Sequence, residues 1–192
     1  IPLNENGKDQ ARKTFEYLRN ISFNKAFSSS MHRPYETAQI ILQNRKDLKI
    51  ERIDSLVEIS HGLWEGKLEA EIREQWPVLL KNWHDKPEEV IMPEGESIKD
   101  VSERSVEAFE KICLSQKDND LSLLVAHDAV NKTLICNLLD MNFSNIWMIK
   151  QGNGGITVID LFKDPTKSNV ISALNITTHL GGIIDSTASG AL

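Results

Sequence analysis

The chain has 192 residues, of which 40% are hydrophobic and 26% are charged, and this balance is typical of one globular domain rather than of a disordered chain. Its net charge of −6 argues against a nucleic-acid partner, since phosphate backbones are held by clusters of lysine and arginine. No apolar run approaches the roughly 18 residues of a membrane span, and no signal-peptide pattern is present. We therefore expect a cytoplasmic protein without a membrane partner.

The two cysteines, Cys113 and Cys136, lie in helical patterns without the spacing of a metal site. We expect buried free thiols in a reducing compartment, and neither a metal nor another cofactor. The first residue is Ile1 rather than Met, so we expect further residues to precede it in the gene product. Nothing in the sequence indicates an oligomeric state.

Helices and strands are expected to alternate along the chain. Predicted helices cover 4–20, a stretch beginning at Pro34, two pieces of 68–83 separated by Pro77, a long stretch from 98 to 112 with Ser97 as N-cap, and 129–138. Predicted strands cover 23–28, 48–56, 121–125, 156–162 and 170–174, the last two as a hairpin. This alternation predicts a three-layer α/β/α domain over residues 1–180. Residues 181–192 are small and polar, and we expect a poorly ordered tail.

The most informative stretch runs from Leu121 to Leu139, because it passes from an apolar strand to an amphipathic helix across His127. Ligands of α/β proteins bind beyond the carboxyl ends of strands, where the next helix directs free N–H groups at them. An anion beside His127 fits this position, with Asp128 as the expected N-cap. The alternative is that His127 only ends the strand and bonds to a neighbouring carbonyl group.

Charged residues stand at other strand-to-helix junctions as well. Arg33 comes just before the helix at Pro34, Glu58 adjoins a loop with two glycines, and Glu96 lies in a Gly-Glu-Ser turn. A phosphate ester needs cations and N–H groups for its oxygens and an acid to protonate its leaving oxygen. Each residue also has a structural explanation, as a solvated charge, a loop surface residue, or a carboxylate favoured by a helix dipole.

Four ordered motifs resemble those of the histidine phosphatase superfamily, the phosphoglycerate-mutase-like proteins. They are SSSMHRPYETA at 28–38, LVEISHGLWEG at 56–66, PEGES at 93–97 and LVAH at 124–127. The resemblance runs from Ile1 to about His179 and implies that family's fold, with a mixed, mostly parallel sheet. It also implies a phosphohistidine formed at the end of the first strand, and no histidine of this sequence matches that position. We therefore expect residues 1–192 to lack that strand and to be inactive by themselves.

The resemblance also implies roles for individual residues. Arg33 is the arginine of the phosphate pocket, Glu58 the proton donor, and His127 the second pocket histidine. Arg33 and His127 are expected to bring positive charge to the phosphoryl group, and Glu96 is a further expected substrate-binding residue. Asp128 stands where many relatives have glycine, and it serves either as helix N-cap or as a residue that selects a substrate with a hydroxyl or cationic group.

The expected function of the intact protein is metal-independent hydrolysis of a small phosphorylated metabolite, such as a phospho-sugar or phospho-sugar acid. The rival among enzymes is a phosphoglycerate mutase, which transfers the phosphoryl group to another hydroxyl instead of to water. We prefer the phosphatase because the stretch from Trp64 to Pro93 is too short for the insertion of cofactor-dependent mutases. The rival of another class is a non-catalytic module that binds phosphorylated metabolites.

Overall fold

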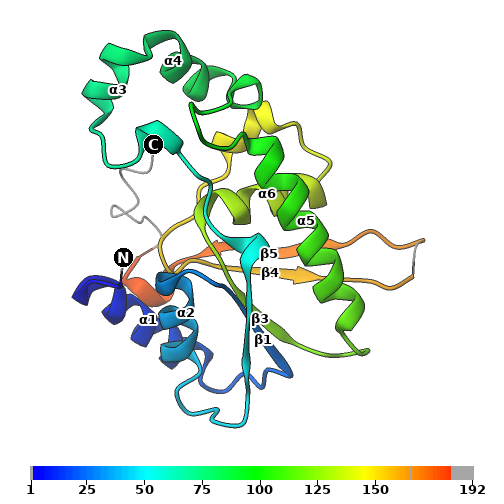
Figure 1. Ribbon diagram of the computed structural model, residues 1–192. Coiled ribbons are helices and arrows are strands. Elements are labelled where there is room, and N and C mark those ends of the chain that lie inside the picture. Colours follow the sequence, from blue (N-terminus) through cyan, green and yellow to red (C-terminus); the bar gives the residue numbers. More distant parts are fainter. Residues whose placement is uncertain (1, 165, 183–192) are drawn as a thin grey trace.

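The computed structural model describes residues 2–164 and 166–182. The α-helices are α1 (Glu5–Leu18), α2 (His32–Ile41), α3 (Glu69–Gln75), α4 (Pro77–Asp85), α5 (Ile98–Ser115) and α6 (Asp128–Leu138). The strands are β1 (Lys25–Ser29), β2 (Ile50–Ile53), β3 (Ser122–Val125), β4 (Ile156–Asp160) and β5 (Val170–Ile176) (Figure 1). Short 3-10 helices follow β2 and several loops, at Asp54–Leu56, Gly62–Trp64, Pro87–Glu89, Phe143–Met148 and Thr178–Leu180.

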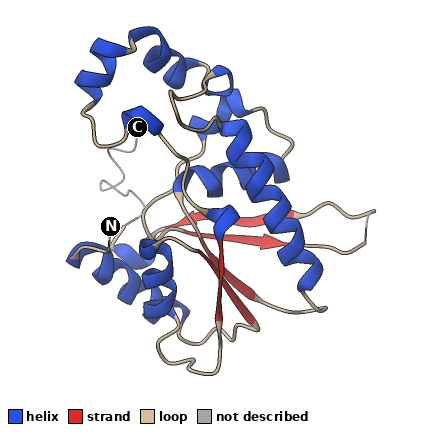
Figure 2. Ribbon diagram, viewed as in Figure 1, coloured by secondary structure: helices blue, strands red, loops and turns tan. Residues whose placement is uncertain are grey.

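A parallel three-stranded sheet with the order β2-β1-β3 lies between two layers of helices (Figure 2). Successive side chains of a strand point to opposite faces, and the sequence uses both. Ala26 and Leu123 pack into a cluster with Ile41 on the face covered by α1 and α2. Phe27 and Leu124 pack into the larger core on the face covered by α5 and α6. The predicted three-layer α/β/α architecture is thereby confirmed.

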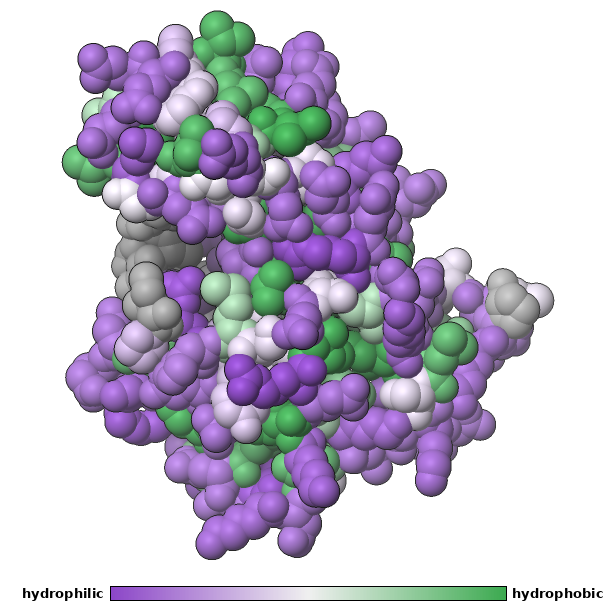
Figure 3. All heavy atoms as spheres, viewed as in Figure 1, coloured by the Kyte–Doolittle hydropathy of each residue, from purple (hydrophilic) through white to green (hydrophobic). Residues whose placement is uncertain are grey.

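Strands β4 and β5 form an antiparallel hairpin that is a separate two-stranded sheet. Within residues 2–164 and 166–182, β3 pairs only with β1, and β4 pairs only with β5. Apolar side chains reach the surface over the hairpin and the parallel sheet (Figure 3). Among the described residues, β3 and β4 therefore each have one side whose backbone groups have no strand beside them.

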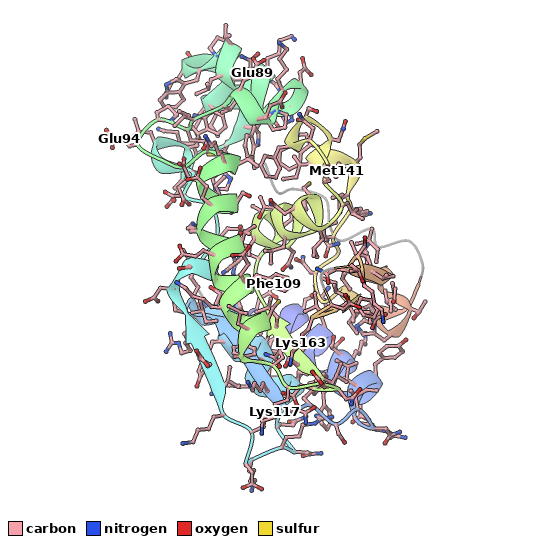
Figure 4. All side chains as sticks on the ribbon, turned by 90° about the vertical axis from the view of Figure 1, so that its right-hand side faces the viewer. Glu89, Glu94, Phe109, Lys117, Met141 and Lys163 are labelled. Carbon is pink, nitrogen blue, oxygen red and sulfur yellow. The ribbon has the colours of Figure 1, made fainter. Side chains whose placement is uncertain are left out.

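A helical cap, defined here as residues 62–93, lies beyond the carboxyl ends of the parallel strands (Figure 1). Its buried side chains join the same core as α5 and α6, and the largest of them are Trp64 and Trp83. Trp147 donates its indole N–H to the carbonyl of Trp83 at 2.8 Å and packs edge-on against that ring. Helix α5 connects the cap to the far end of the molecule, passing from the side of Glu94 by way of Phe109 toward Lys117 (Figure 4).

Several predicted boundaries need correction. Helix α2 begins at His32, so Pro34 is its third residue and Arg33 lies inside the first turn rather than before the helix. Helix α6 begins at Asp128, and His127 occupies the N-cap position without a side-chain capping bond, so the predicted N-cap role of Asp128 is wrong.

Two predicted strands are also shorter than expected. The strand predicted over 48–56 is only Ile50–Ile53, because the chain then turns into a 3-10 helix, and the strand predicted to reach 162 ends at Asp160.

The predicted N-cap of α5 is confirmed. Ser97 caps α5 in a box in which Asp100 N donates to Ser97 Oγ and Ser97 N donates to the Asp100 carboxylate. Both cysteines are free, with Cys136 buried and Cys113 half-buried, and burial raises the pKa of each thiol to about 11. In the part of the chain that the structure describes, no helix combines the length and apolar character needed to cross a membrane. Most of the predicted tail, from residue 183 on, lies outside the described residues.

Candidate active site

His127 lies at the carboxyl end of β3 with 7% of its surface exposed. Its Nε2 shares a hydrogen bond of 3.0 Å with Ser29 Oγ at the end of the neighbouring strand β1, and Ser29 Oγ also accepts from Met31 N at 3.2 Å. Burial is the main cause that lowers the pKa of His127 to about 4, and the charges of Arg33 and Arg104 lower it further. The imidazole is therefore neutral at pH 7 in the free protein, which corrects the expectation that it carries positive charge there.

Arg33 is exposed in the first turn of α2, directly after β1. Its charge reaches His127, since it lowers the pKa of that imidazole. Among the described residues, its guanidinium makes no hydrogen bond or ion pair. An exposed guanidinium beside a buried imidazole at the ends of adjacent parallel strands suits an incoming anion, because its planar fork can donate to two phosphate oxygens.

Glu58 follows β2, and its carboxylate Oε2 lies 3.8 Å from Nδ1 of His127. Burial is the main cause that raises the pKa of Glu58, and the nearby carboxylate of Asp128 raises it further. The amides of Ile59, Ala129 and Asp128 act in the opposite direction without reversing the shift. Glu58 thus keeps its proton to higher pH than an ordinary glutamate, as a general acid must.

Asp128 and Lys132 form an ion pair of 2.8 Å on the first turn of α6. Lys132 is 9% exposed, and its ammonium lies 5.1 Å from the centre of the Trp147 ring. The lysine uses only Oδ2 of the aspartate, whereas Oδ1 is buried and has no hydrogen-bond partner among the residues that the structure describes. A buried acceptor without a partner is costly, so a hydrogen-bond donor of a bound molecule would be stabilised there.

The loop that carries Glu58 packs directly on the Gly-Glu-Ser turn. Gly62 has a φ of +53°, and a Cβ at this position would lie 2.1 Å from the carbonyl oxygen of Pro93. A Cβ on Gly95 would lie 2.5 Å from the carbonyl oxygen of Ser60. Only glycine permits this close approach of the two backbones. The second and third sequence motifs therefore form one structural unit.

Glu96 lies on the far side of that unit, and its carboxylate binds Arg104 rather than the space around His127. Arg104 Nε donates to Glu96 Oε1 at 2.8 Å, and the amide of Ser60 donates to Glu96 Oε2 at 2.9 Å. These hydrogen bonds outweigh the effect of burial and lower the pKa of Glu96. The predicted contact of Glu96 with substrate stays a prediction.

The contacts described for the remaining histidines do not include His127. His32 is exposed with its Nδ1 3.5 Å from Glu36 Oε2, and half-buried His61 meets the edge of the Trp83 ring. His84 is exposed on α4. His179, for which the sequence offers no role, stacks on Tyr17 and makes hydrogen-bond contacts to Thr14 Oγ1 and the carbonyl of Gly154, so it joins the end of β5 to α1.

Sequence reasoning missed three residues that contact the predicted ones. Ser29 was interpreted as part of a serine-rich loop, although it ends a buried strand. Arg104 and Lys132 lie outside the four sequence motifs. A signal for both exists in the helical period: Arg104 lies three residues after Val101, which is buried on α5, and Lys132 lies three residues after Ala129, which is buried on α6.

Comparisons with known proteins show the family to which this chain belongs. The model of the histidine phosphatase superfamily (branch 1) matches residues 1–174. The chain belongs to the histidine phosphatase superfamily. It is 32% identical over 179 residues to phosphoserine phosphatase 1 of Hydrogenobacter thermophilus, a match that covers 93% of this chain and 82% of that protein.

Solved structures of similar proteins show the same fold. The protein YhfR of Bacillus stearothermophilus superposes with a TM-score of 0.86 at 26% identity, over 93% of this chain and 87% of that one. A phosphoserine phosphatase of Entamoeba histolytica in complex with phosphoserine superposes with a TM-score of 0.79 at 28% identity, over 94% and 87% of the two chains. As a member of this superfamily with phosphatases among its relatives, the protein is a phosphatase, and the predicted family and fold are confirmed.

Proposed function

We propose that the intact protein hydrolyses a small phosphorylated metabolite through a phosphohistidine, with Arg33, Glu58 and His127 as the residues of this chain that act on the phosphoryl group. The observation that supports it most is the convergence of these side chains at the ends of the parallel strands. There, a glutamate with a raised pKa lies 3.8 Å from a neutral, buried histidine beside an exposed arginine.

The first step makes a bond between the nucleophilic imidazole nitrogen and phosphorus and breaks the bond between phosphorus and the ester oxygen. Glu58 gives its proton to that leaving oxygen, so the alcohol departs neutral. In the second step water attacks phosphorus, the Glu58 carboxylate accepts a proton of the water, and phosphate leaves with the imidazole restored. Arg33 holds the equatorial oxygens in both steps, and His127 contributes through contacts that strengthen as negative charge develops.

The nucleophile is supplied, in this proposal, by a strand that lies between β3 and β4. The support for this place is that β3 and β4 each have an unpaired edge in the described chain. A strand in this gap satisfies both edges. If it runs parallel to β3, its carboxyl end meets His127, since the carboxyl ends of parallel strands lie at one edge of a sheet.

Asp128 binds the part of the substrate beyond the phosphate. The support is its Oδ1, which is buried without a partner next to His127, while Oδ2 is held by Lys132. A hydroxyl or an ammonium group of the substrate donates to Oδ1. Phosphoserine carries such an ammonium group, and a phospho-sugar or phospho-sugar acid carries such hydroxyls.

The test is phosphate release by the intact protein from phosphoserine and from a panel of phospho-sugars and phospho-sugar acids. We expect hydrolysis of at least one of them, together with phosphate bound covalently to the protein in an acid-labile, alkali-stable form, as phosphohistidine is. Transfer of the phosphoryl group to a second hydroxyl of the substrate would establish a mutase instead. No release and no labelled protein would overturn the proposal.

A further inference from the structure

Arg104 of α5 donates from both terminal nitrogens of its guanidinium to the backbone around Glu58. Its side chain is 19% exposed, and its Nη1 donates to the carbonyl oxygens of Ser55 at 2.9 Å and Val57 at 2.7 Å. Its Nη2 donates to the carbonyl oxygen of Glu58 itself at 3.2 Å. One arginine therefore binds the backbone immediately before the proposed proton donor and at the donor itself.

Glu96 completes the arrangement from the other side. It accepts from Arg104 Nε at 2.8 Å and from Arg104 Nη2 at 2.9 Å, which is a bidentate pair. Its Oε2 also accepts from the amide of Ser60 at 2.9 Å, and its own amide donates to the carbonyl oxygen of Ser60 at 2.9 Å. The backbone is thus held at positions 55, 57, 58 and 60, on both sides of the Glu58 side chain.

We propose that Arg104 and Glu96 are positioning residues that hold Glu58 at the distance from which it protonates the leaving group. This inference rests on the proposed function of Glu58 and assigns Glu96 to the support of the loop instead of to substrate contact. The pair touches neither the phosphoryl group nor the nucleophile. It acts through the backbone, because a shift of the donor by about 1 Å is enough to cost catalysis about 10²-fold.

The charges of the pair fit this role. A lone guanidinium behind the loop would favour ionised Glu58 and remove the proton that the leaving group needs. Glu96 pairs with Arg104 at 2.8 Å and offsets part of this charge, while the remainder lowers the pKa of His127. The pKa of Glu58 is nevertheless raised, so the arginine holds the carbonyl groups without reversing the effect of burial on the acid.

The experiment compares wild-type intact protein with Arg104→Gln, Arg104→Lys and Glu96→Gln. The matched control is Lys111→Gln, which removes an exposed ion pair with Glu107 on the same helix. Turnover is measured on phosphoserine, or on whichever alkyl phosphate the wild type hydrolyses, and on p-nitrophenyl phosphate, whose leaving group needs little protonation. We expect Arg104→Gln to lower kcat on the alkyl phosphate at least about 10-fold more than on the aryl phosphate, within the range of general acid catalysis. Arg104→Lys should recover part of this difference, and Lys111→Gln should leave both rates unchanged.

Hydrogen exchange of the segment 54–61, followed by mass spectrometry, supplies a readout that does not depend on turnover. Exchange in this segment should become at least about 10-fold faster in Arg104→Gln and in Glu96→Gln, and remain unchanged in Lys111→Gln. Equal losses of kcat on both substrates, or unchanged exchange in both variants, would overturn the inference. Absence of hydrolysis by the wild type would instead overturn the proposed function, and the exchange measurement would still decide whether the pair holds the loop. If Arg104→Gln does not fold, Arg104→Lys and Glu96→Gln carry the same comparison.

Discussion

Glu58 and Glu96 stand on two loops that pack backbone to backbone, yet their surroundings shift the pKa values of the two carboxyl groups in opposite directions. The Glu58 loop faces His127, where burial and the charge of Asp128 raise the pKa of the glutamate. The Glu96 turn faces α5. There the hydrogen bonds from Arg104 and from the amide of Ser60 lower the pKa of Glu96. The direction of the pKa shift of these two glutamates therefore depends on whether a cation lies within hydrogen-bond distance of the carboxylate. Among the described residues, no lysine or arginine lies at hydrogen-bond distance from the carboxylate of Glu58, whereas Arg104 lies 2.8 Å from that of Glu96.

The largest expected effect comes from the proton donor itself. Glu58→Gln keeps the shape of the side chain and removes its acidic proton, so turnover on an alkyl phosphate should fall by about 10²- to 10⁴-fold. Turnover on p-nitrophenyl phosphate should fall much less, because that leaving group is stable as an anion. Steady-state kinetics on both substrates separates the two effects. If both rates fall equally, Glu58 positions the substrate instead of protonating it, and Asp128 becomes the acid to test.

The second prediction concerns the expected anion pocket beside Glu58, formed by Arg33 and His127. Vanadate should raise the melting temperature of the intact protein by binding the folded state preferentially. Arg33→Ala should remove most of that shift, and Arg33→Lys should restore only part of it, since a point charge does not reproduce the planar fork. Arg73→Ala, which removes an exposed arginine from α3, is the control. An Arg33→Ala variant that responds to vanadate as wild type does would contradict the pocket.

The third prediction follows from the pKa of His127, which folding lowers from about 6.5 to about 4. Below pH 6.5 the unfolded chain binds a proton at this site and the folded protein does not, so the free energy of unfolding falls as the pH drops from 6.5 to 4. The loss from this site is about 3 kcal/mol. The raised pKa of Glu58 acts oppositely, since its contribution to stability is lost as the pH rises.

Denaturant unfolding of the intact protein at several pH values measures the effect of His127. His127→Gln should flatten the fall between pH 6.5 and 4, so the difference between the two proteins isolates this histidine from Glu58. Identical pH dependence of wild type and variant would show that His127 is protonated in the folded protein.

The smallest expected effect concerns Asp128, whose charge supports the raised pKa of Glu58. Asp128→Asn keeps a side-chain oxygen but removes the charge, so the pKa of Glu58 should move back toward its ordinary value. The limb of the rate profile that depends on protonated Glu58 should then shift to lower pH by less than about one unit. A pH profile of kcat on an alkyl phosphate measures the shift. An unmoved profile would show that the two carboxylates do not interact.

Much of this site could be predicted from the sequence because the motifs lie where strands end. His127, Arg33 and Glu58 each follow a strand of one parallel sheet, so recognising the strands was enough to predict that they meet. The partners that set their charge states were not predictable in the same way. Arg104 and Lys132 reach the site from the middle of helices, and spacing alone does not reveal which loop a helix covers. Glu96 lies within a predicted motif, yet the side of the turn to which its carboxylate points depends on Arg104.

The first residue of each helix could not be predicted from the sequence either, since it depends on local backbone geometry. Pro34 suited the first helical position, but α2 begins two residues earlier at His32. Asp128 suited an N-cap, but its carboxylate pairs with Lys132 one turn along the helix and leaves the capping position to His127.

The contrast between Glu58 and Glu96 is tested most directly by carboxyl carbon NMR of the intact protein labelled at glutamate. Glu58→Gln and Glu96→Gln assign the two resonances, and a pH titration then follows each one. We expect the pKa of Glu58 to lie above that of an ordinary glutamate and the pKa of Glu96 to lie below it. A pKa of Glu58 equal to or below that of Glu96 would mean that Glu58 is ionised at neutral pH. That result would contradict the assignment of Glu58 as proton donor and of Glu96 as positioning residue.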